Sequence, residues 1–565
     1  MLVSADMRNL LSASLLIVLV VSKLAAQSAS VQQHPRDGEI HDADTLRWWH
    51  TTEALSGDAM EGRDTGSAAY QRAAEYVAGR FKAAGLLPAG DDGTYFQRVP
   101  MHEVQVEPAG TSFVVERAGG ALKLDFLQEI TVAASETALH EGSGALAFRG
   151  YCGKEEMTDV AGKIVVCFGT QRIGLPSGVE RAANAKAAGA LGVVSVDDPY
   201  FTIEPPRWPY AYARSVTLRE AGGEGVRLGT MLPGMRLSAE AFAKLLAGSG
   251  QDAAEILKLG GAKQPLPNFE IPGRLRVRLK LSSRDFSSPN VLAVRPGSDA
   301  QLAGQYVVVA AHLDGYGYGT PVHGDNLYNG TLDDAAYVAL LIQMADDLTA
   351  GAAGHTGLTR VSYAGAPNGG GQTDGGSDAI EKGITLVPTK RSILFCAFTG
   401  EEKGLLGSSW FVKHPTVPVA ELAADINLDQ LRPLFPLKIM TAEAVNDTTL
   451  GATAREVGKG MGIEIREDRE PERGLLRRAD QYPFLKIHVP AISFIFGYDP
   501  GTDAERRYRE WYEVRYHRPQ DDLTQPVDFQ AAETFDVFFY RLVETVADAA
   551  VRPAILPDSQ FADKK

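Results

Sequence analysis

The sequence contains very few cysteines. Three cysteines among 565 residues are too few to cross-link a disulfide-dense scaffold. Cys152 and Cys167 could pair in an oxidising compartment, but the sequence alone leaves this pairing open. Cys396 lies within an apolar run, so we expect a buried hydrophobic residue rather than a nucleophile.

The chain also lacks an excess of basic residues. It has 56 Lys and Arg against 71 Asp and Glu, a formal net charge of -15. Nucleic acids and anionic membrane surfaces select clustered Lys and Arg, so we expect neither as a partner. The 44% apolar and 22% charged fractions are typical of a folded globular protein. Its length exceeds that of one hydrophobic core and predicts two or more domains.

Apart from the N-terminus, the sequence lacks an apolar run long enough to span a membrane. The run LLSASLLIVLVV follows Arg8 and precedes the small residues LAAQSAS. This order is typical of a secretory signal peptide and is short for a membrane span. We predict a signal peptide over residues 1–29 and a secreted or periplasmic protein without membrane attachment after cleavage. An uncleaved N-terminal anchor is the alternative.

The spacing of apolar residues predicts two kinds of structure. Residues 70–84 have helical periodicity, which Gly85 ends. Residues 143–285 contain strand-like segments such as KIVVCF and a stretch that alternates apolar and basic residues. From residue 290, apolar strands such as YVVVAA and SILFCAF alternate with helical patterns such as AAYVALLIQMADDL. This alternation favours an α/β layer with a largely parallel sheet.

Histidines and acidic residues follow the predicted C-terminal strands. His312 and Asp314 come directly after YVVVAA, and in an extended chain both side chains lie on one face. The further candidates are Asp333 and Asp334, Glu401 and Glu402, Asp429 and His517. Taken singly, they have ordinary explanations as helix caps, turn formers or solvated residues. Together they suit divalent metals, and a set without thiolates favours catalytic zinc over structural zinc.

Five separated motifs resemble, in their order, those of the co-catalytic zinc aminopeptidases, a family that also includes glutamate carboxypeptidase and the transferrin receptor. They are His312-Leu-Asp314, Asn329-Gly330 with Asp333-Asp334, Thr399-Gly-Glu401-Glu402-Lys-Gly, Asn427-Leu-Asp429 and Tyr516-His517-Arg-Pro. The segment MEGRDTGSAAYQRAAEYVAGRF resembles the opening helix of secreted bacterial members. The segments GKIVVCFGTQR and AKAAGALGVVSV resemble the protease-associated (PA) domain inserted in many of them.

The resemblance implies a mostly parallel mixed sheet sandwiched by helices, as in zinc exopeptidases, with an inserted β-rich PA domain. We expect the N-terminal part of the peptidase domain at residues 41–128, a PA-like domain at 129–285 and the catalytic zinc peptidase domain at 286–555. The PA-like domain could act as a substrate gate or interaction surface, or pack only as an accessory layer.

Carried over motif by motif, the family's roles imply two Zn2+ ions. His312 and Asp429 would bind one zinc, Glu402 and His517 the other, and Asp333 would bridge them. Asp314 would orient His312. Glu401 would be the general base on the water that the two metals activate. These roles imply a secreted metalloexopeptidase, an aminopeptidase that removes N-terminal residues from peptides.

Three alternatives remain open. A carboxypeptidase should place a cationic clamp near the metals, for which Arg432 and Arg515 are candidates. A glutaminyl-cyclase-like enzyme should keep only one zinc, and a receptor-like member should have lost catalysis.

Three segments depart from the family's pattern. Ala336-Tyr337 stands where many relatives have Ser-Gly, and Arg478-Ala-Asp480-Gln481 where they often show Ser-Asp-His. The Gly-rich residues 351–376 have no counterpart in the pattern, and their composition favours a tether over a lid.

Overall fold

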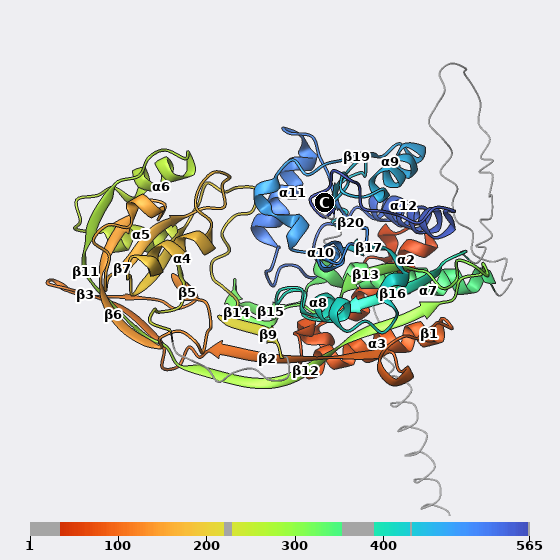
Figure 1. Cartoon of the computed structure of the whole chain (residues 1–565), viewed down its shortest axis with the longest axis horizontal. Helices are drawn as coiled ribbons and strands as arrows, with labels where there is room; N and C mark the ends of the chain where they lie inside the picture. Colours follow the sequence, from red (N-terminus) through yellow and green to blue (C-terminus); the bar gives the residue numbers. More distant parts are fainter. Residues whose placement is uncertain (1–33, 220–228, 353–388, 430–431, 563–565) are drawn as a thin grey trace, which may run out of the picture.

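A computed structural model describes residues 34–219, 229–352, 389–429 and 432–562. The expected signal peptide and most of the Gly-rich segment lie outside these ranges. Within them, no helix combines the length and the apolar character needed to cross a membrane. The strands form two large sheets, which lie at opposite ends of the molecule (Figure 1).

The larger sheet has parallel strands at its centre. Its order is β19-β18-β20-β17-β13-β16-β12-β2-β9, with β1 beside β12. The central strands β20, β17, β13 and β16 run parallel, and antiparallel strands flank them on both sides. The bounds are β1 Leu87–Pro88, β2 Phe96–Val106, β9 Arg214–Leu218, β12 Leu281–Arg295, β13 Tyr306–His312, β16 Ser392–Phe398, β17 Leu422–Leu428, β18 Ile439–Glu443, β19 Glu464–Arg466 and β20 Ala491–Phe496. This arrangement confirms the predicted α/β fold class.

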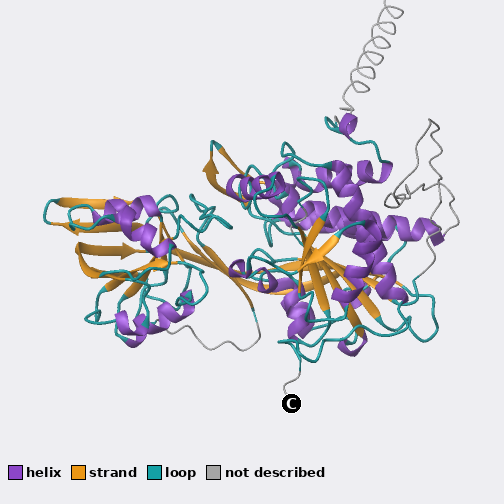
Figure 2. Cartoon of the chain, turned by 90° about the horizontal axis from the view of Figure 1, so that it is seen from above, coloured by secondary structure: helices purple, strands orange, loops and turns teal. Residues whose placement is uncertain are grey.

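Helices cover both faces of this sheet, which explains why its central strands are predominantly apolar (Figure 2). Successive residues of β13 show the two faces: Val307 and Val309 belong to one core, Val308 and Ala310 to the other. The first core includes residues of α2 Ala43–Ser56, α3 Ala68–Ala83, α7 Ala336–Ala352, α9 Leu450–Met461, α11 Asp503–Val514 and α12 Phe529–Asp548. The second includes residues of α8 Leu406–Lys413 and α10 Gln481–Lys486, together with the buried, unpaired Cys396.

The helix predicted over residues 70–84 is α3. Its first turn is capped by Ser67, whose hydroxyl accepts a hydrogen bond from the Tyr70 N–H. Its apolar positions are fully buried against the large sheet, because they recur on one side of the helix.

The smaller sheet has the order β4-β3-β11-β6-β7-β8-β10-β5 and its own core. Its strands are β3 Ser112–Arg117, β4 Gly120–Leu124, β5 Ile130–Val132, β6 Glu141–Arg149, β7 Ile164–Gly169, β8 Gly192–Asp197, β10 Met235–Leu237 and β11 Asn268–Arg278. Its helices are α4 Gly178–Ala187, α5 Ala239–Leu246 and α6 Ala253–Gly261. A disulfide joins Cys152 to Cys167 in β7, with their Cα atoms 5.6 Å apart.

The two sheets are connected by a long antiparallel ladder. β2 and β12 pair from Phe96 to Val106 and run from the larger sheet toward the smaller one (Figure 1). β3 and β4 lie within the expected peptidase segment, but β3 pairs with β11 of the smaller sheet and β4 pairs with β3. Conversely β9, within the expected PA segment, pairs with β2 of the larger sheet. The domain limits at residues 128 and 285 remain a prediction.

Candidate metal centre

The predicted site residues meet at the carboxyl ends of the parallel strands. His312 is the last residue of β13, Glu401 and Glu402 follow β16, and Asp429 follows β17. Asp333 lies in the short helical segment η5 Thr331–Ala335, which leads into α7. In open α/β sheets, this edge is where ligands bind.

The structure brings five of these side chains into two groups that share one residue. His312, Asp333 and Asp429 form one group, and Asp333, Glu402 and His517 form the other, with the possible ligand atoms of each group within 4.8 Å of one another. Asp333 Oδ1 lies 3.4 Å from His312 Nε2, and Oδ2 lies 3.2 Å from His517 Nε2. Each oxygen of Asp333 therefore faces a different histidine.

Three atoms in these groups that could bind a metal ion are buried and have no hydrogen-bond partner among the described residues. They are His312 Nε2, Asp333 Oδ2 and Asp429 Oδ1. Buried polar atoms are rarely left unpaired, because desolvation without a partner costs about 1–3 kcal/mol each. A cation would satisfy all three, and imidazole with carboxylate is a donor set that suits zinc. The residues therefore fit the metal that the sequence predicted.

The protonation of the two histidines depends on their surroundings. Burial and the nearby Arg207 lower the pKa of His517 to about 3, so its imidazole is neutral, as a metal ligand must be. Burial also acts to lower the pKa of His312, but Asp334 and Glu401 raise it well above its usual range. A bound cation would oppose this rise, because it competes with the proton for the same lone pair.

Asp314 contacts the ring of His312 through its backbone carbonyl and not through its carboxylate. The Nδ1 atom of His312 is 3.0 Å from the backbone oxygen of Asp314, whereas the carboxylate is 3.8 Å away, too far for a hydrogen bond. The carboxylate instead accepts hydrogen bonds from the Thr65 hydroxyl at 2.8 Å and from the Glu401 N–H at 3.0 Å. The side chain of Asp314 thus fixes the turn that carries Glu401, and its carbonyl orients His312.

Glu401 and Glu402 point into the same pocket but differ in their contacts. Glu402 Oε2 lies 3.3 Å from His517 Nε2, within the second group. Glu401 belongs to neither group, and its Oε2 lies 3.9 Å from His312 Nε2. Burial, together with the charges of Asp429 and Glu402, raises the pKa of Glu401 well above its usual range. Its carboxyl is therefore suited to receive and hold a proton.

Several residues that support the site were not predicted. The guanidinium of Arg63 is fully buried and donates hydrogen bonds to the carbonyls of Leu55, Leu313, Asn329 and Gly330. No spacing in the sequence indicates this role, because the carbonyls lie up to 267 residues away.

Tyr316 and Asp521 were also missed. The Tyr316 hydroxyl lies 2.8 Å from His517 Nδ1, which leaves Nε2 to face the ligand groups. The Asp521 carboxylate accepts hydrogen bonds from the N–H groups of Leu332 and Asp333 and so holds η5 in place. Asp521 could have been noticed only as one of two acids that follow His517 closely.

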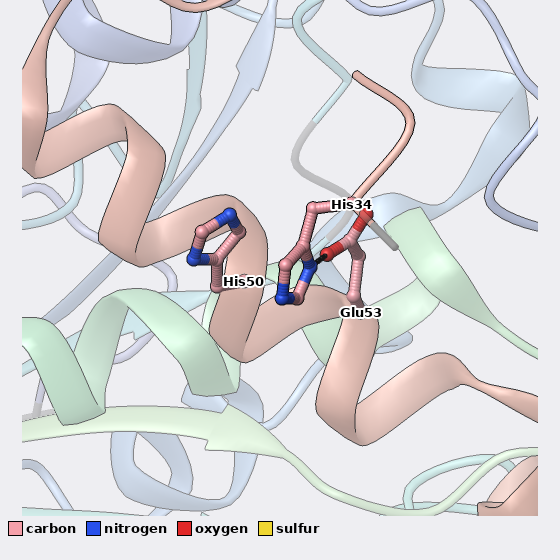
Figure 3. A group of neighbouring side chains, drawn as sticks. All are labelled: His34, His50 and Glu53. Carbon is pink, nitrogen blue, oxygen red and sulfur yellow. Dashed lines mark hydrogen bonds and ion pairs between the residues drawn. The ribbon is translucent and has the colours of Figure 1, made fainter. Parts of the chain in front are cut away.

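His34, His50 and Glu53 form another group whose atoms are close enough to hold a metal (Figure 3). Their contacts favour a structural role. Nδ1 of His34 contacts the Glu53 carboxylate, and His50 Nε2 lies 2.8 Å from Asp37. The two imidazole rings are stacked, 3.8 Å apart and 24° from parallel. Their in-plane lone pairs do not converge on one point, so we interpret the group as a tie between the N-terminal segment and α2.

A comparison with protein families decides the identity of the chain. The profile of peptidase family M28 matches residues 290–541, and that of the PA domain matches residues 130–243. Residues 290–541 therefore form a peptidase family M28 domain, and a PA domain lies before it in the chain. The expected metallopeptidase is confirmed at the level of this family, and the predicted insertion of a PA domain is confirmed as well.

Solved structures of bacterial enzymes share the fold of this M28 peptidase. An aminopeptidase from Aneurinibacillus sp. strain AM-1 superimposes with a TM-score of 0.54 at 16% identity, covering 91% of this chain and 96% of that one. BSAP, a zinc aminopeptidase from Bacillus subtilis, gives 0.52 at 17% identity, covering 92% and 97%. At these identities the likeness establishes the fold alone. A comparison with curated proteins gave no match.

Proposed function

We propose that this M28 peptidase is a secreted zinc aminopeptidase that removes N-terminal residues from peptides. The observation that supports it most strongly is the position of Asp333, whose two carboxylate oxygens face the two histidines of adjoining ligand groups. Such a carboxylate can bridge two metal ions. The solved structures that share the fold carry the name aminopeptidase, which favours action at the N-terminus.

In this proposal His312, Asp333 and Asp429 would hold one zinc ion, and Asp333, Glu402 and His517 would hold a second. When bound, zinc supplies Lewis acidity, which polarises a peptide carbonyl and acidifies water. The ligands on β13, β16 and β17 keep their positions because these strands are hydrogen-bonded neighbours in one sheet.

Glu401 is the proposed general base. Its backbone N–H is held by Asp314, and its carboxylate lines a pocket of about 500 Å³ together with four of the five ligand residues. From there it can take a proton from the attacking water and pass it to the leaving amine. Its raised pKa favours the protonated form between these two steps.

Secretion is part of the same proposal. The N-terminal apolar run has the anatomy of a signal peptide, and the disulfide between Cys152 and Cys167 would be stable in an oxidising compartment. We also propose the domain order given above, a PA insertion between two parts of the peptidase domain, with β3 and β4 assigned to the sheet of the insertion and β9 to the sheet of the peptidase domain.

Mass-spectrometric digestion of a peptide panel tests the proposal. The panel combines free or acetylated N-termini with free or amidated C-termini, with added zinc or with a chelator. Loss of single residues only from free N-termini, stopped by the chelator, is the expected result. Cleavage only from free C-termini would replace the aminopeptidase with a carboxypeptidase. Cyclisation of N-terminal glutamine, or no reaction in zinc-loaded samples, would overturn the peptidase assignment for this chain.

A further inference from the structure

The pocket beside the metal groups has a basic wall. Arg207, Arg477, Arg478 and Lys486 line it, together with the carboxylates Asp333, Glu401, Glu402 and Asp429. Four cations in one pocket are notable in a chain whose net charge is -15. We call these four side chains the basic wall.

One carboxylate partly neutralises this wall. The side chain of Glu204 is 9% exposed and lies 2.6 Å and 3.0 Å from the guanidinium nitrogens of Arg478. It also lies 3.3 Å from Arg207 and 3.9 Å from the buried Arg473. Three guanidinium groups therefore share a single carboxylate, which leaves an excess of positive charge.

The other two cations of the wall have no acidic partner. Among the described residues, no carboxylate lies within ion-pair distance of Arg477 or Lys486, and both side chains are exposed at the pocket. The ammonium group of Lys486 lies only over the ring of Tyr482, 5.0 Å from its centre. These two groups are free to meet an anion that enters the pocket.

The wall is held close to the metal groups by stacking. The guanidinium of Arg207 lies 4.6 Å from the ring centre of Tyr516, the neighbour of His517 in the chain. Glu204 and Arg207 come from the segment between β8 and β9, which connects the smaller sheet to the larger one. Arg478 lies in the segment that departs from the family's Ser-Asp-His pattern, where the sequence left the pocket undefined.

We propose that the basic wall binds a carboxylate of the peptide next to the scissile bond, so that the enzyme prefers peptides with an anionic group at that point. The carboxylate can come from an acidic side chain on either side of the bond or from the free C-terminus of a dipeptide. This inference rests on the proposed peptidase function, because it assigns the substrate class of the same pocket. Arg432 and Arg515, the clamp candidates named from the sequence, do not line this pocket. Arg432 is buried against Trp511 and Tyr512.

Hydrolysis of a set of dipeptides separates the sources of the carboxylate. The neutral reference is Ala-Ala amide, and the three test peptides are Glu-Ala amide, Ala-Glu amide and Ala-Ala with a free C-terminus. At least one test peptide should show kcat/KM about tenfold above the reference, the effect of roughly 1.4 kcal/mol of added binding. Equal values for all four peptides would overturn the proposal.

Substitutions at the two unpaired cations locate the effect. In the double variant Arg477→Gln and Lys486→Gln, kcat/KM for the preferred peptide should fall about tenfold more than kcat/KM for the reference peptide, mainly through KM. The matched control is Lys459→Gln, an exposed residue of α9 that does not line the pocket, which should change neither value. The preference should weaken as salt is raised. An equal loss on all four peptides would mean that the wall is structural.

A binding measurement keeps this inference separate from the peptidase proposal. The zinc-loaded Glu401→Gln protein is titrated by calorimetry with the same four peptides, so that affinity is read without turnover. Tighter binding of a test peptide than of Ala-Ala amide, lost with the two wall substitutions, supports the wall even if no peptide is cleaved. Equal affinities would refute the wall while leaving the peptidase proposal to its own test.

Discussion

At the residue scale, the two neighbouring acids Glu401 and Glu402 differ in what they touch. Glu402 faces His517 within a ligand group, whereas Glu401 stands outside both groups and is held through its backbone by Asp314. Glu401→Gln should therefore keep its zinc content, measured by metal analysis, and lose about 10²–10⁴-fold in kcat. Retained activity would contradict the general-base role, and lost zinc would make Glu401 a ligand.

Arg63 offers a second test at this scale. Its guanidinium donates hydrogen bonds to four carbonyls, one in α2 and three in the segments that follow β13 and β15 (Asp325–Tyr328), so its removal leaves them without these donors. Arg63→Met should lower the free energy of unfolding by about 3 kcal/mol or more, measured by urea titration. The control is Arg72→Met, because the Arg72 side chain is 46% exposed and should contribute less than about 1 kcal/mol. Similar losses for both variants would contradict this role.

At the element scale, strand β18 carries a buried acid away from the metal centre. Burial, with the nearby charge of Asp468, raises the pKa of Glu443 to about 8, and its Oε1 lacks a hydrogen-bond partner among the described residues. In the unfolded chain a glutamate titrates near about 4.3. Between these pH values the folded protein keeps a proton that the unfolded chain has released. The stability that this carboxyl contributes is therefore fully present below about pH 4 and is lost as pH rises to about 8.

Glu443→Gln removes this titration. The stability of the variant relative to the native protein should increase from about pH 5 to pH 8, by up to a few kcal/mol. Urea unfolding of both proteins at several pH values measures this difference in the free energy of unfolding. Glu456→Gln, at an exposed position of α9, should give a difference that does not vary with pH. A pH-independent difference for Glu443→Gln would show that its carboxyl titrates normally.

The elements also show what the sequence could and could not predict. The ends of β13, β16 and β17 were predictable, since apolar runs stop there at polar residues, and His312, Glu401, Glu402 and Asp429 follow these ends. Asp333 and His517 follow none of these strands, and their roles came from the resemblance of their motifs. The pairing of β2 with β12 was not predictable, because paired residues such as Phe96 and Val291 lie far apart in the chain and no local sequence pattern indicates that they pair. The hydrogen bond from the Thr65 hydroxyl, which holds the Asp314 carboxylate in place, was not predictable for the same reason.

In the molecule as a whole, the PA insertion contacts the peptidase domain. The segment between β8 and β9 supplies Glu204 to Arg478 and Arg207 to Tyr516, so it contacts the peptidase body beside the metal groups. Although burial opposes it, Arg207 and Arg478 hold the pKa of Glu204 well below its usual range. The carboxylate is thus charged at neutral pH, and it joins the insertion to the catalytic pocket.

Glu204→Gln tests whether this joint holds the insertion in place. The substitution leaves three guanidinium groups without their shared carboxylate, and because Arg207 and Arg478 are partly exposed, the cost should lie below the roughly 3–5 kcal/mol of breaking a fully buried ion pair. Because the contact lies between two bodies with separate cores, we expect local opening rather than global unfolding. Hydrogen exchange of residues 198–213 should become faster, while exchange in β13 and β16 stays unchanged. Glu240→Gln, at an exposed position of α5, is the matched control. Unchanged exchange in residues 198–213 would mean that the insertion is held by its other contacts, and that Glu204 serves only to balance the charge of the pocket.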